Sequence, residues 1–453
     1  MIDKLRIDSL KLRNFRCFVN VDAPIKFHPA LTVFVARNGG GKSAILDAIR
    51  VSLGTFTKKT SSYSQSNFRH SDASIDPSNL LNEQGSLYPI SVLARGSVDG
   101  KDVYWARTLG AGGRTTTKEA HVITDYGERL SSGINDGSGL DTALPILAYY
   151  GTNRLWEASD VKTADQPFAY QSRLEGYTDA LTERSLFASV KSWLKYAYKV
   201  SDSKVESETG VGRRVVRQFA AVRNALNVVL SKEGWQNVHY SHSYEQMAVE
   251  RHVDSGGNDL DHSIVVPISW TSDGVLAVFA LVADIAYRCA RLNPQFGEEA
   301  CARTEGIVMI DEVDLSLHPK WQQHILTDLM EVFPRIQFIV TTHSPQIVSS
   351  ISRESLRILT DNGVAPFDLP TQGVEVSEIL RGVFGTNPTP QNLEIVNKLN
   401  RLIELTSSGF GDTKEWDAIY KELVIYYGDN YGPLLGVVKH KDFLKRINEE
   451  RNA

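Results

Sequence analysis

The sequence has few cysteines and no long hydrophobic run, and each of these features excludes a class of protein. Its 453 residues include three cysteines, Cys17, Cys289 and Cys301. They are too few and too widely spaced for a disulfide framework or a zinc site, so a reducing compartment is expected. No run of about 18 apolar residues is available to span a membrane. The first 25 residues carry charge in every turn, unlike a signal peptide, and predict a soluble, cytoplasmic protein.

The chain also lacks an excess of positive charge. Its 49 basic residues stand against 54 acidic residues, a net charge of −5. Binding to nucleic acid by overall charge is therefore excluded, although a local basic face remains open. Hydrophobic residues make up 42% of the chain and charged residues 23%, which is enough apolar material for a sizeable core. The length allows two or three structural units.

A phosphate-binding loop is the first motif that carries chemistry. An apolar strand at 31–35 runs directly into the segment Ala36-Arg37-Asn38-Gly39-Gly40-Gly41-Lys42-Ser43, and a helical pattern follows. This nearly matches G-x-x-x-x-G-K-S, with Ala36 replacing the first glycine. Glycines let backbone N–H groups close around a phosphate, Lys42 neutralises phosphate charge, and the Ser43 hydroxyl can bind Mg²⁺. The alternative is a glycine-rich turn without a ligand.

Two further strands end in polar residues. The apolar run 306–310 ends in Asp311 and Glu312, where the first carboxylate can lie beside a metal and the second can activate water as a general base. The run 338–342 ends in His343, and one helix, at about 320–333, separates the two runs. We therefore expect neighbouring strands, with His343 near the γ-phosphate of a nucleotide. In isolation, an acidic pair or a histidine at a strand end is more often structural.

The fourth motif begins a long apolar helix. Thr271-Ser272-Asp273-Gly274 precedes a nearly uninterrupted helical apolar stretch over 275–292. Ser272 and Asp273 suit a helix N-cap, where free N–H groups and the helix dipole favour a phosphate. A plain cap without a ligand is the alternative interpretation.

The order of these four motifs resembles that of the ABC-type ATPase heads of the RecF/SMC/OLD-like branch. Thr271 to Gly274 is similar to the signature sequence of these heads, Asp311-Glu312 to their Walker B pair and His343 to their switch histidine. Asp314 to Pro319 resembles the D-loop, and Asn14-Phe15-Arg16 resembles an opening motif whose arginine helps hold the nucleotide. The glutamine that often binds Mg²⁺ has no clear match; Gln65 and Asp72 are candidates.

The resemblance implies an α/β fold with ATP and Mg²⁺ as ligands. We expect an N-terminal ATPase lobe with a β subdomain at 1–155 and a mostly helical insertion without a long coiled coil at 156–262. A C-terminal ATPase lobe is expected at 263–365, and a helical region at 366–453. Residues 55–85 are predicted to be a surface excursion, 88–130 short strands and 131–142 a polar loop. In this family, heads dimerise head to tail and the signature serine, here Ser272, acts on the nucleotide of the other head.

Within this branch the chain looks like the ATPase subunit of Septu-type anti-phage systems. The segments that carry this likeness are 149–156, 292–294, 317–319 and 376–381. It implies a homo-oligomer that hydrolyses ATP, has no nuclease site of its own and controls a separate HNH-type nuclease. A RecF-like DNA-repair clamp is the alternative, and an ATP-binding module that signals by dimerising is a third.

The contribution of basic residues to function stays open. A possible DNA face comprises Lys191, Lys195, Lys199, Lys204, Arg213, Arg214 and Arg217, although a solvated helix surface is the simpler interpretation. Arg154 and Trp156 could lie near the nucleotide or the dimer seam. The tail cluster Lys439, Lys441, Lys445 and Arg446 has the same ambiguity.

Overall fold

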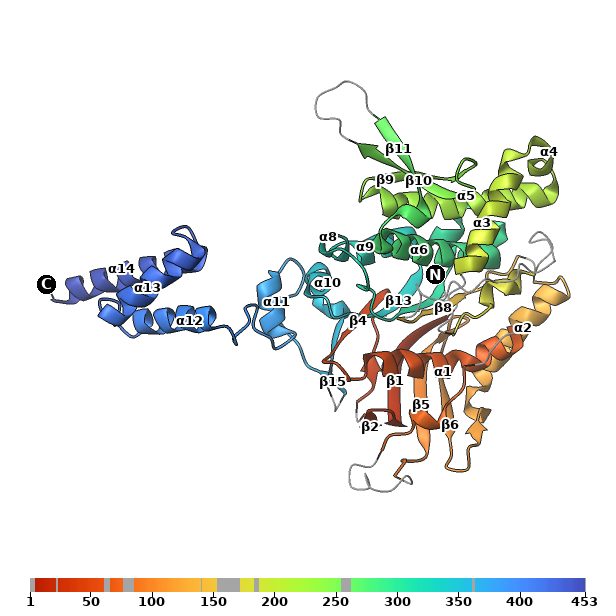
Figure 1. Cartoon of the computed structure of the whole chain (residues 1–453). Helices are drawn as coiled ribbons and strands as arrows, with labels where there is room; N and C mark the ends of the chain where they lie inside the picture. The colour runs from red at the N-terminus through yellow and green to blue at the C-terminus, as the bar shows by residue number, and fades with distance from the viewer. Residues whose placement is uncertain are drawn as a thin grey trace. The chain divides into compact units, whose positions relative to one another are not determined.

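The structure is a computed structural model that describes residues 5–21, 23–60, 66–75, 85–139, 141–152, 172–182, 187–253, 262–360 and 363–452. The chain divides into two compact units, Met1–Val376 and Ser377–Ala453 (Figure 1). Gln65, Arg154 and Trp156 lie outside the described residues. No helix in the described ranges is both long and apolar enough to cross a membrane.

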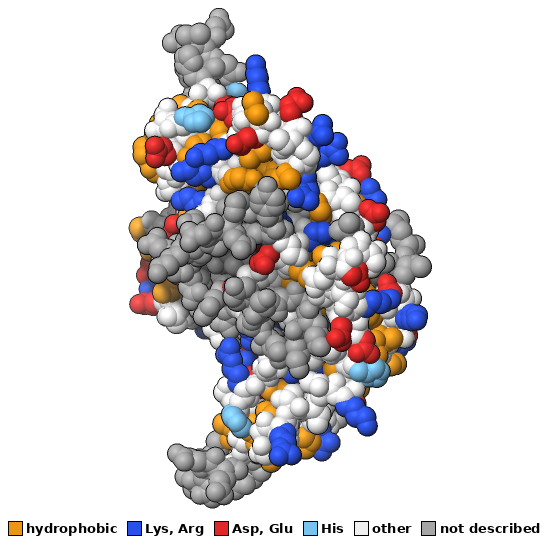
Figure 2. Space-filling model, turned by 90° about the vertical axis from the view of Figure 1, so that its right-hand side faces the viewer, with side chains coloured by type: hydrophobic (Ala, Val, Ile, Leu, Met, Phe, Trp, Pro, Cys, Tyr) orange, Lys and Arg blue, Asp and Glu red, His pale blue; other side chains and the backbone are white. Residues whose placement is uncertain are grey.

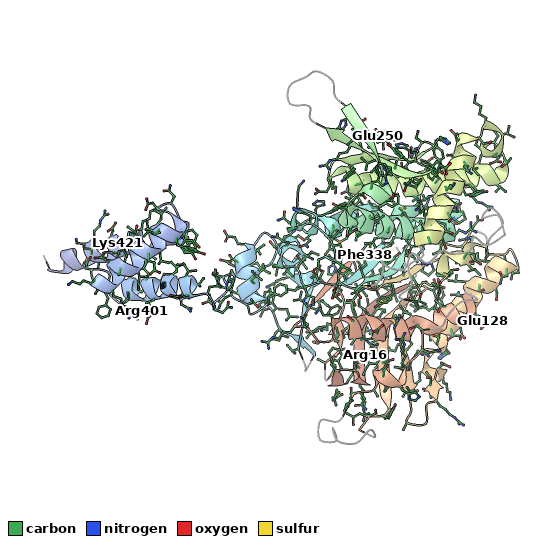
Figure 3. The ribbon with its side chains drawn as sticks, in the orientation of Figure 1. Arg16, Glu128, Glu250, Phe338, Arg401 and Lys421 are labelled. Atoms are coloured by element: carbon green, nitrogen blue, oxygen red, sulfur yellow. The ribbon has the colours of Figure 1, made fainter. Side chains whose placement is uncertain are left out.

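The core of the first unit is a six-stranded sheet in the order β15-β14-β4-β13-β12-β8. Its strands are β4 (Leu31–Val35), β8 (Ile146–Tyr150), β12 (Gly306–Ile310), β13 (Ile336–Thr341), β14 (Leu356–Thr360) and β15 (Gly363–Ala365). All neighbours are parallel except β14 and β15. Every residue of β4, β8, β12 and β13 is buried, including Phe338 (Figure 3). Burial on both faces explains why their sequences are almost continuously apolar, and the predicted α/β head with a P-loop core sheet is confirmed.

Helix α1 (Lys42–Thr60) follows β4 and continues beyond its predicted end. Residues 55–60, which we expected to begin a surface excursion, belong to this helix. Phe56 explains the extension, because its side chain is fully buried and packs against Tyr126 and Tyr177 with ring centroids 5.9 and 5.3 Å apart. These contacts come from distant parts of the chain and are not visible in the local pattern.

The N-terminal β subdomain is an antiparallel sheet in the order β2-β1-β5-β6-β7, with β3 paired to β1. Its strands are β1 (Leu5–Phe15), β2 (Phe18–Asn20), β3 (Ile25–Lys26), β5 (Ile90–Val98), β6 (Lys101–Leu109) and β7 (Thr115–Thr116). The expected N-terminal ribbon and the strands after residue 88 are present. The strands do not reach residue 130, however, because α2 (His121–Asn135) occupies the last part of that range and the start of the predicted loop.

Helix α2 forms because it can bury one face against α1. Ile123, Tyr126 and Leu130 recur at helical spacing and are buried. The two helices approach so closely that a Cβ on Gly127 would lie 2.6 Å from the Phe56 carbonyl oxygen. Glycine therefore permits the contact that stabilises this helix.

The insertion begins with helices and ends with a small sheet. The helices are α3 (Phe187–Asp202), α4 (Lys204–Ser207) and α5 (Gly210–Ser231), as the helical periodicity predicts. An antiparallel sheet of β9 (Trp235–Ser241), β10 (Gln246–Val253) and β11 (His262–Pro267) follows, in the order β11-β10-β9. The sequence predicted strands only from residue 264, because a register shift between Ala248 and Glu250 interrupts the alternation.

Helix α6 (Asp273–Leu292) lies between the insertion and the core sheet (Figure 1). Nearly all of its residues are buried, and a polar network inside the protein fixes its position. The Tyr150 hydroxyl donates to the Asp284 carboxylate at 2.6 Å, and Arg288 Nε donates to the same oxygen at 2.9 Å. Burial and the neighbouring Asp284 raise the pKa of Tyr150 well above its ordinary value. The network ties α6 to strand β8.

The remaining short helices of the first unit are α7 (Ala300–Arg303), α8 (Pro319–Gln322), α9 (Ile325–Val332) and α10 (Pro345–Ser350). Helix α11 (Val376–Gly382) begins at the boundary between the units, and the second unit continues with α12 (Glu394–Ser407), α13 (Lys414–Tyr427) and α14 (Gly432–Asn452). The predicted helical C-terminal region is thereby confirmed. Its own core includes Leu402, Trp416 and Leu423. Arg401 and Lys421 mark its polar surface (Figure 3).

Candidate nucleotide-binding site

The phosphate loop lies between the carboxyl end of β4 and the start of α1, as its sequence context predicts. It borders a cavity of about 350 Å³. The cavity is lined by Arg16, Cys17, Asn38, Gly39, Gly40, Gly41, Lys42, Ser43, Ala44, Glu312 and His343. Residues separated by about 300 positions in the sequence therefore meet at one place. Arg37 belongs to the same loop and is exposed.

The loop conformation requires glycine. Gly39 and Gly41 have φ angles of 77° and 87°, a region that other L-residues rarely adopt. A Cβ on Gly41 would lie 2.5 Å from the Phe18 ring and 2.7 Å from the Cys17 sulfur. On Gly40 it would lie 2.8 Å from the Ala36 Cβ. Side chains at Gly40 and Gly41 would thus fill the loop, and a glycine-rich loop at the start of a helix fits a phosphate.

Lys42 is held inside this loop. Its ammonium group donates to the carbonyl oxygen of Ala36 at 3.2 Å, and its side chain is largely buried. Burial lowers the pKa of Lys42 below its ordinary value, although three nearby carboxylates act in the opposite direction. A phosphate in the cavity would supply the anionic partner that favours the charged form.

Ser43 and Asp311, the two predicted magnesium ligands, are in direct contact. The Ser43 hydroxyl donates to Asp311 Oδ2 at 2.7 Å, and Thr341 Oγ1 donates to Oδ1 at 2.5 Å. Asp311 directly follows β12, so the parallel sheet delivers its carboxylate to the loop. A hydroxyl and a carboxylate are hard oxygen ligands, and this pair beside the phosphate cradle fits Mg²⁺.

Glu312 and His343 line the same cavity from adjacent strands. The pairing of Ile310 with Val340 aligns the ends of β12 and β13 and brings both segments to one edge of the sheet. Glu312 has a φ of 46°, and its backbone N–H donates to Thr341 Oγ1 at 2.8 Å. Its conformation is therefore held by the neighbouring strand.

The D-loop is attached to the switch segment. Asp314 accepts hydrogen bonds from Thr342 Oγ1 at 2.6 Å and from the His343 backbone N–H at 3.4 Å. Thr341 and Thr342 are not among the site residues predicted from the sequence. The two threonines immediately before His343 are the only signal that could have suggested these anchoring contacts.

Arg16 reaches the cavity from the turn between β1 and β2 (Figure 3). It forms ion pairs with Asp47 and with Asp72, the latter at 2.9 Å. Burial acts to lower the pKa of Arg16, but the two carboxylates outweigh it and raise the pKa. Asp72, a candidate magnesium ligand, also accepts from the Arg69 backbone N–H at 2.8 Å. Its carboxylate is used to position Arg16, and the residue does not line the cavity.

The signature segment lies outside the cavity of its own chain. Ser272 caps α6 by accepting from the Val275 N–H, and Ser272 and Asp273 are both exposed. Gly274 lies against the D-loop, where an added Cβ would be 2.7 Å from the Ser316 carbonyl oxygen. None of these three signature residues is among those that line the cavity.

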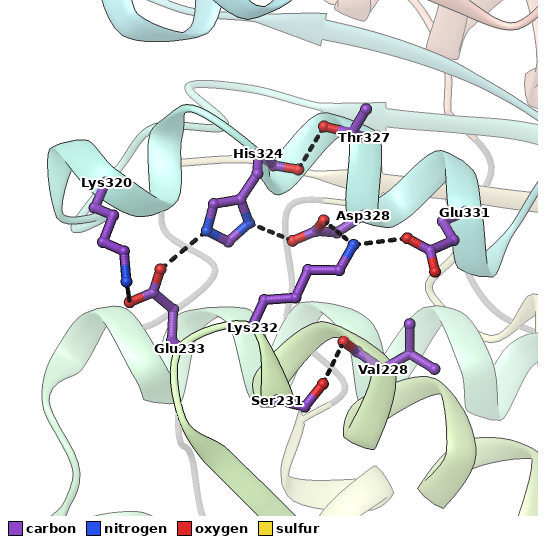
Figure 4. A network of polar contacts seen from close by, with 9 residues as sticks. All are labelled: Val228, Ser231, Lys232, Glu233, Lys320, His324, Thr327, Asp328 and Glu331. Carbon is purple, nitrogen blue, oxygen red and sulfur yellow. Dashed lines mark hydrogen bonds and ion pairs between the residues drawn. The ribbon is translucent and has the colours of Figure 1, made fainter.

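A polar network joins the end of α5 in the insertion to the segment of α8 and α9 in the core (Figure 4). His324 contacts Asp328 Oδ2 at 2.5 Å and Glu233 Oε1 at 2.9 Å through its two ring nitrogens. Lys232 forms 2.6 Å ion pairs with Asp328 and Glu331. The end of α5 is thereby fixed to α9, which follows the D-loop through α8.

The basic residues predicted as a possible DNA face are exposed on α3, α4 and α5. On the face shown in Figure 2, the described Lys and Arg side chains alternate with Asp and Glu. In the tail cluster, Lys441 pairs with Asp412 at 3.0 Å and lies over the Trp416 ring at 4.0 Å. The exposure of the basic residues on α3, α4 and α5 favours a solvated helix surface. The contacts of Lys441 favour a structural role within the second unit.

Known proteins of similar sequence or structure include ATPases and proteins of the Septu system. The family described as "AAA domain, putative AbiEii toxin, Type IV TA system" matches residues 31–349. The "Retron Vc95 probable ATPase" of Vibrio cholerae serotype O1 biovar El Tor is 24% identical over 468 residues, which covers 93% of this chain and 88% of that protein. The "Septu protein PtuA" of Bacillus thuringiensis is 32% identical over 145 residues, 30% of this chain and 35% of that protein. The SMC head domain from Thermotoga maritima aligns with a TM-score of 0.45 and 15% identity, over 81% of this chain and 100% of that chain.

Proposed function

Because the chain belongs to the family described as AAA domain, putative AbiEii toxin, Type IV TA system, we propose that it is the ATP-hydrolysing subunit of an anti-phage defence complex. One observation carries this proposal: Lys42, Glu312 and His343 line a single cavity whose Ser43 is hydrogen-bonded to Asp311. The likeness to a retron ATPase and to a Septu protein supports the defence role.

Each group of residues around the cavity has a separate role in the proposed hydrolysis of ATP. The loop amides and Lys42 bind the phosphates, while Arg16 and Asn38 border the same space. Glu312 accepts a proton from the attacking water as the bond between the γ-phosphorus and its bridging oxygen breaks. His343 stabilises the negative charge on the transferred group. Ser43 and Asp311 would hold Mg²⁺, which supplies charge neutralisation when bound.

We propose that the working unit contains at least two copies of the chain. None of the signature residues lines the cavity of its own chain, and Ser272 and Asp273 are exposed. A head-to-tail pair would place the α6 N-terminus of one copy at the phosphate of the other. The resemblance to Septu ATPase subunits further suggests a separate HNH-type nuclease as partner. On the one face drawn in Figure 2, Lys and Arg side chains are interspersed with Asp and Glu, so this face presents a mixed surface to a DNA backbone.

Steady-state ATP turnover by the purified protein tests this proposal. Glu312→Gln keeps the size of the side chain but removes the basic carboxylate, so we expect ATP binding to persist and turnover to fall by about 10²–10⁴-fold. Lys42→Ala is the matched comparison: it should lose ATP binding itself, because phosphate charge is left uncompensated. Wild-type turnover in the glutamine variant would show that the general base lies elsewhere.

A further inference from the structure

The surface beside the signature segment carries an exposed aromatic pair. Trp270 is 68% exposed and Tyr244 40% exposed, and their rings meet edge to face with centroids 5.2 Å apart. The structure describes six tryptophans, and the other five are at most 9% exposed. An exposed tryptophan is costly in water unless a partner covers it, and tryptophan is enriched where interfaces concentrate their binding energy.

Local hydrogen bonds hold the turn that carries Trp270. Trp270 ends a short helical turn that leads directly into α6, whose N-cap is Ser272. Ser269 Oγ donates to Gln246 Oε1 at 2.7 Å, which joins this turn to strand β10. The Thr271 hydroxyl donates to the Ile268 carbonyl oxygen at 2.7 Å. Trp270 is therefore presented only two residues from the exposed signature serine.

The charges around the pair indicate what covers it. Glu245 and Asp273 are exposed next to Tyr244 and Ser272, so this edge is acidic and would repel a nucleic-acid backbone. In the phosphate loop at the nucleotide cavity, the exposed Arg37 offers a positive charge to such an acidic edge, whereas Arg16 lines the cavity and is already paired with Asp47 and Asp72. The signature edge of one copy therefore complements the cavity rim of another.

We propose that Trp270 and Tyr244 dock on the cavity rim of a second copy of this chain when ATP closes the head dimer. This inference rests on the proposed function, because it assumes that Ser272 completes the nucleotide site of the other copy. It adds a binding role for an aromatic pair outside the ATPase motifs. The pair would supply apolar contact area beside a phosphate-binding contact that is itself polar.

The test measures ATP-dependent dimerisation by sedimentation velocity in the Glu312→Gln background, which should retain ATP. Trp270→Ala should weaken the dimer by about tenfold or more, and Trp270→Phe should restore most of the affinity. Tyr104→Ala is the control, because Tyr104 is 59% exposed but lies on β6 in a different sheet. ATP binding by the separate heads should be unchanged in all three variants.

Each other outcome overturns the inference. Unchanged dimerisation of both Trp270→Ala and Tyr244→Ala would show that the pair does not lie in the interface. Equal loss in Tyr104→Ala would show a general effect of surface truncation. Loss of DNA binding without loss of dimerisation would assign the pair to nucleic acid. Failure of the parent Glu312→Gln protein to dimerise with ATP would instead contradict the proposed head dimer itself.

Discussion

Several residues around the nucleotide cavity hold backbone conformations that are unfavourable for their side chains. Asn14, Arg16, Glu312 and Ser316 all have φ angles between 46° and 64°. Each lies in a motif at or beside the cavity, and such strain persists only where surrounding contacts compensate for it. Here the compensation includes ion pairs to Arg16 and the hydrogen bond from the Glu312 N–H to Thr341.

At the residue scale, Gly41 offers a sharp test of the phosphate cradle. Gly41→Ala should reduce ATP affinity by about tenfold or more, because a Cβ there would enter the space of Cys17 and Phe18. Gly39→Ala is a matched control with a similar positive φ, but its added Cβ meets nothing within 4 Å. Isothermal titration with ATP should show a larger loss for Gly41→Ala. Equal losses would show that backbone strain alone is responsible.

At the scale of secondary-structure elements, the insertion and the core are joined by the charged network of α5, α8 and α9 (Figure 4). Asp328 is 1% exposed and Glu233 18% exposed at the side chain, so these charges are largely removed from water. Burial acts to raise the pKa of Glu233, but hydrogen bonds from His324 and Lys320 outweigh it and lower the pKa. The charged carboxylate is therefore favoured in the folded protein.

This shift predicts a stability contribution that depends on pH. A carboxylate whose pKa is depressed by folding stabilises the protein above its ordinary pKa of 4.5, and the contribution is lost as pH falls through the folded value. Glu233→Gln should lower the free energy of unfolding by about 1–3 kcal/mol at pH 7. The difference from wild type should shrink below pH 4.5, as measured by urea unfolding at several pH values.

Glu331→Gln is the matched control for this prediction. Glu331 pairs with Lys232 in the same network, but its side chain is 58% exposed, so its removal should cost less than about 1 kcal/mol. Similar losses for the two variants, or a Glu233→Gln effect that persists unchanged at low pH, would contradict the role assigned to Glu233.

At the scale of the whole molecule, the nucleotide cavity and the signature segment are separate surfaces of one unit. Ser272→Arg should leave ATP binding by each head intact but prevent closure of the head dimer, because a bulky cation would occupy the phosphate position across the seam. Nucleotide binding and ATP-dependent dimerisation are measured separately. Ser203→Arg is the control, since Ser203 caps α4 in the same way but belongs to the insertion. If Ser272→Arg lost both ATP binding and dimerisation, Ser272 would act only as the N-cap of α6 and not as a contact to the other copy.

The sequence alone was sufficient to predict the candidate nucleotide-binding site because its signals are local. The loop at 36–43, the acidic pair after 310 and the histidine after 342 each follow a strand buried on both faces, which appears as an uninterrupted apolar run. The carboxyl ends of parallel strands share one edge of a sheet. The order of the motifs was therefore sufficient to predict that Lys42, Glu312 and His343 meet.

Only the tertiary structure decided features that depend on contacts between distant segments. Helix α2 forms where strands and the start of a polar loop were predicted, because one of its faces is buried against α1. The position of Arg16 depends on Asp47 and Asp72, and the anchoring of Asp311 on Thr341, and no local periodicity encodes these pairs. The exposure of Trp270 likewise depends on tertiary packing, because no local pattern shows that the folded protein leaves its side chain uncovered. A local pattern records which residues favour burial, whereas folding decides which surfaces are available to bury them.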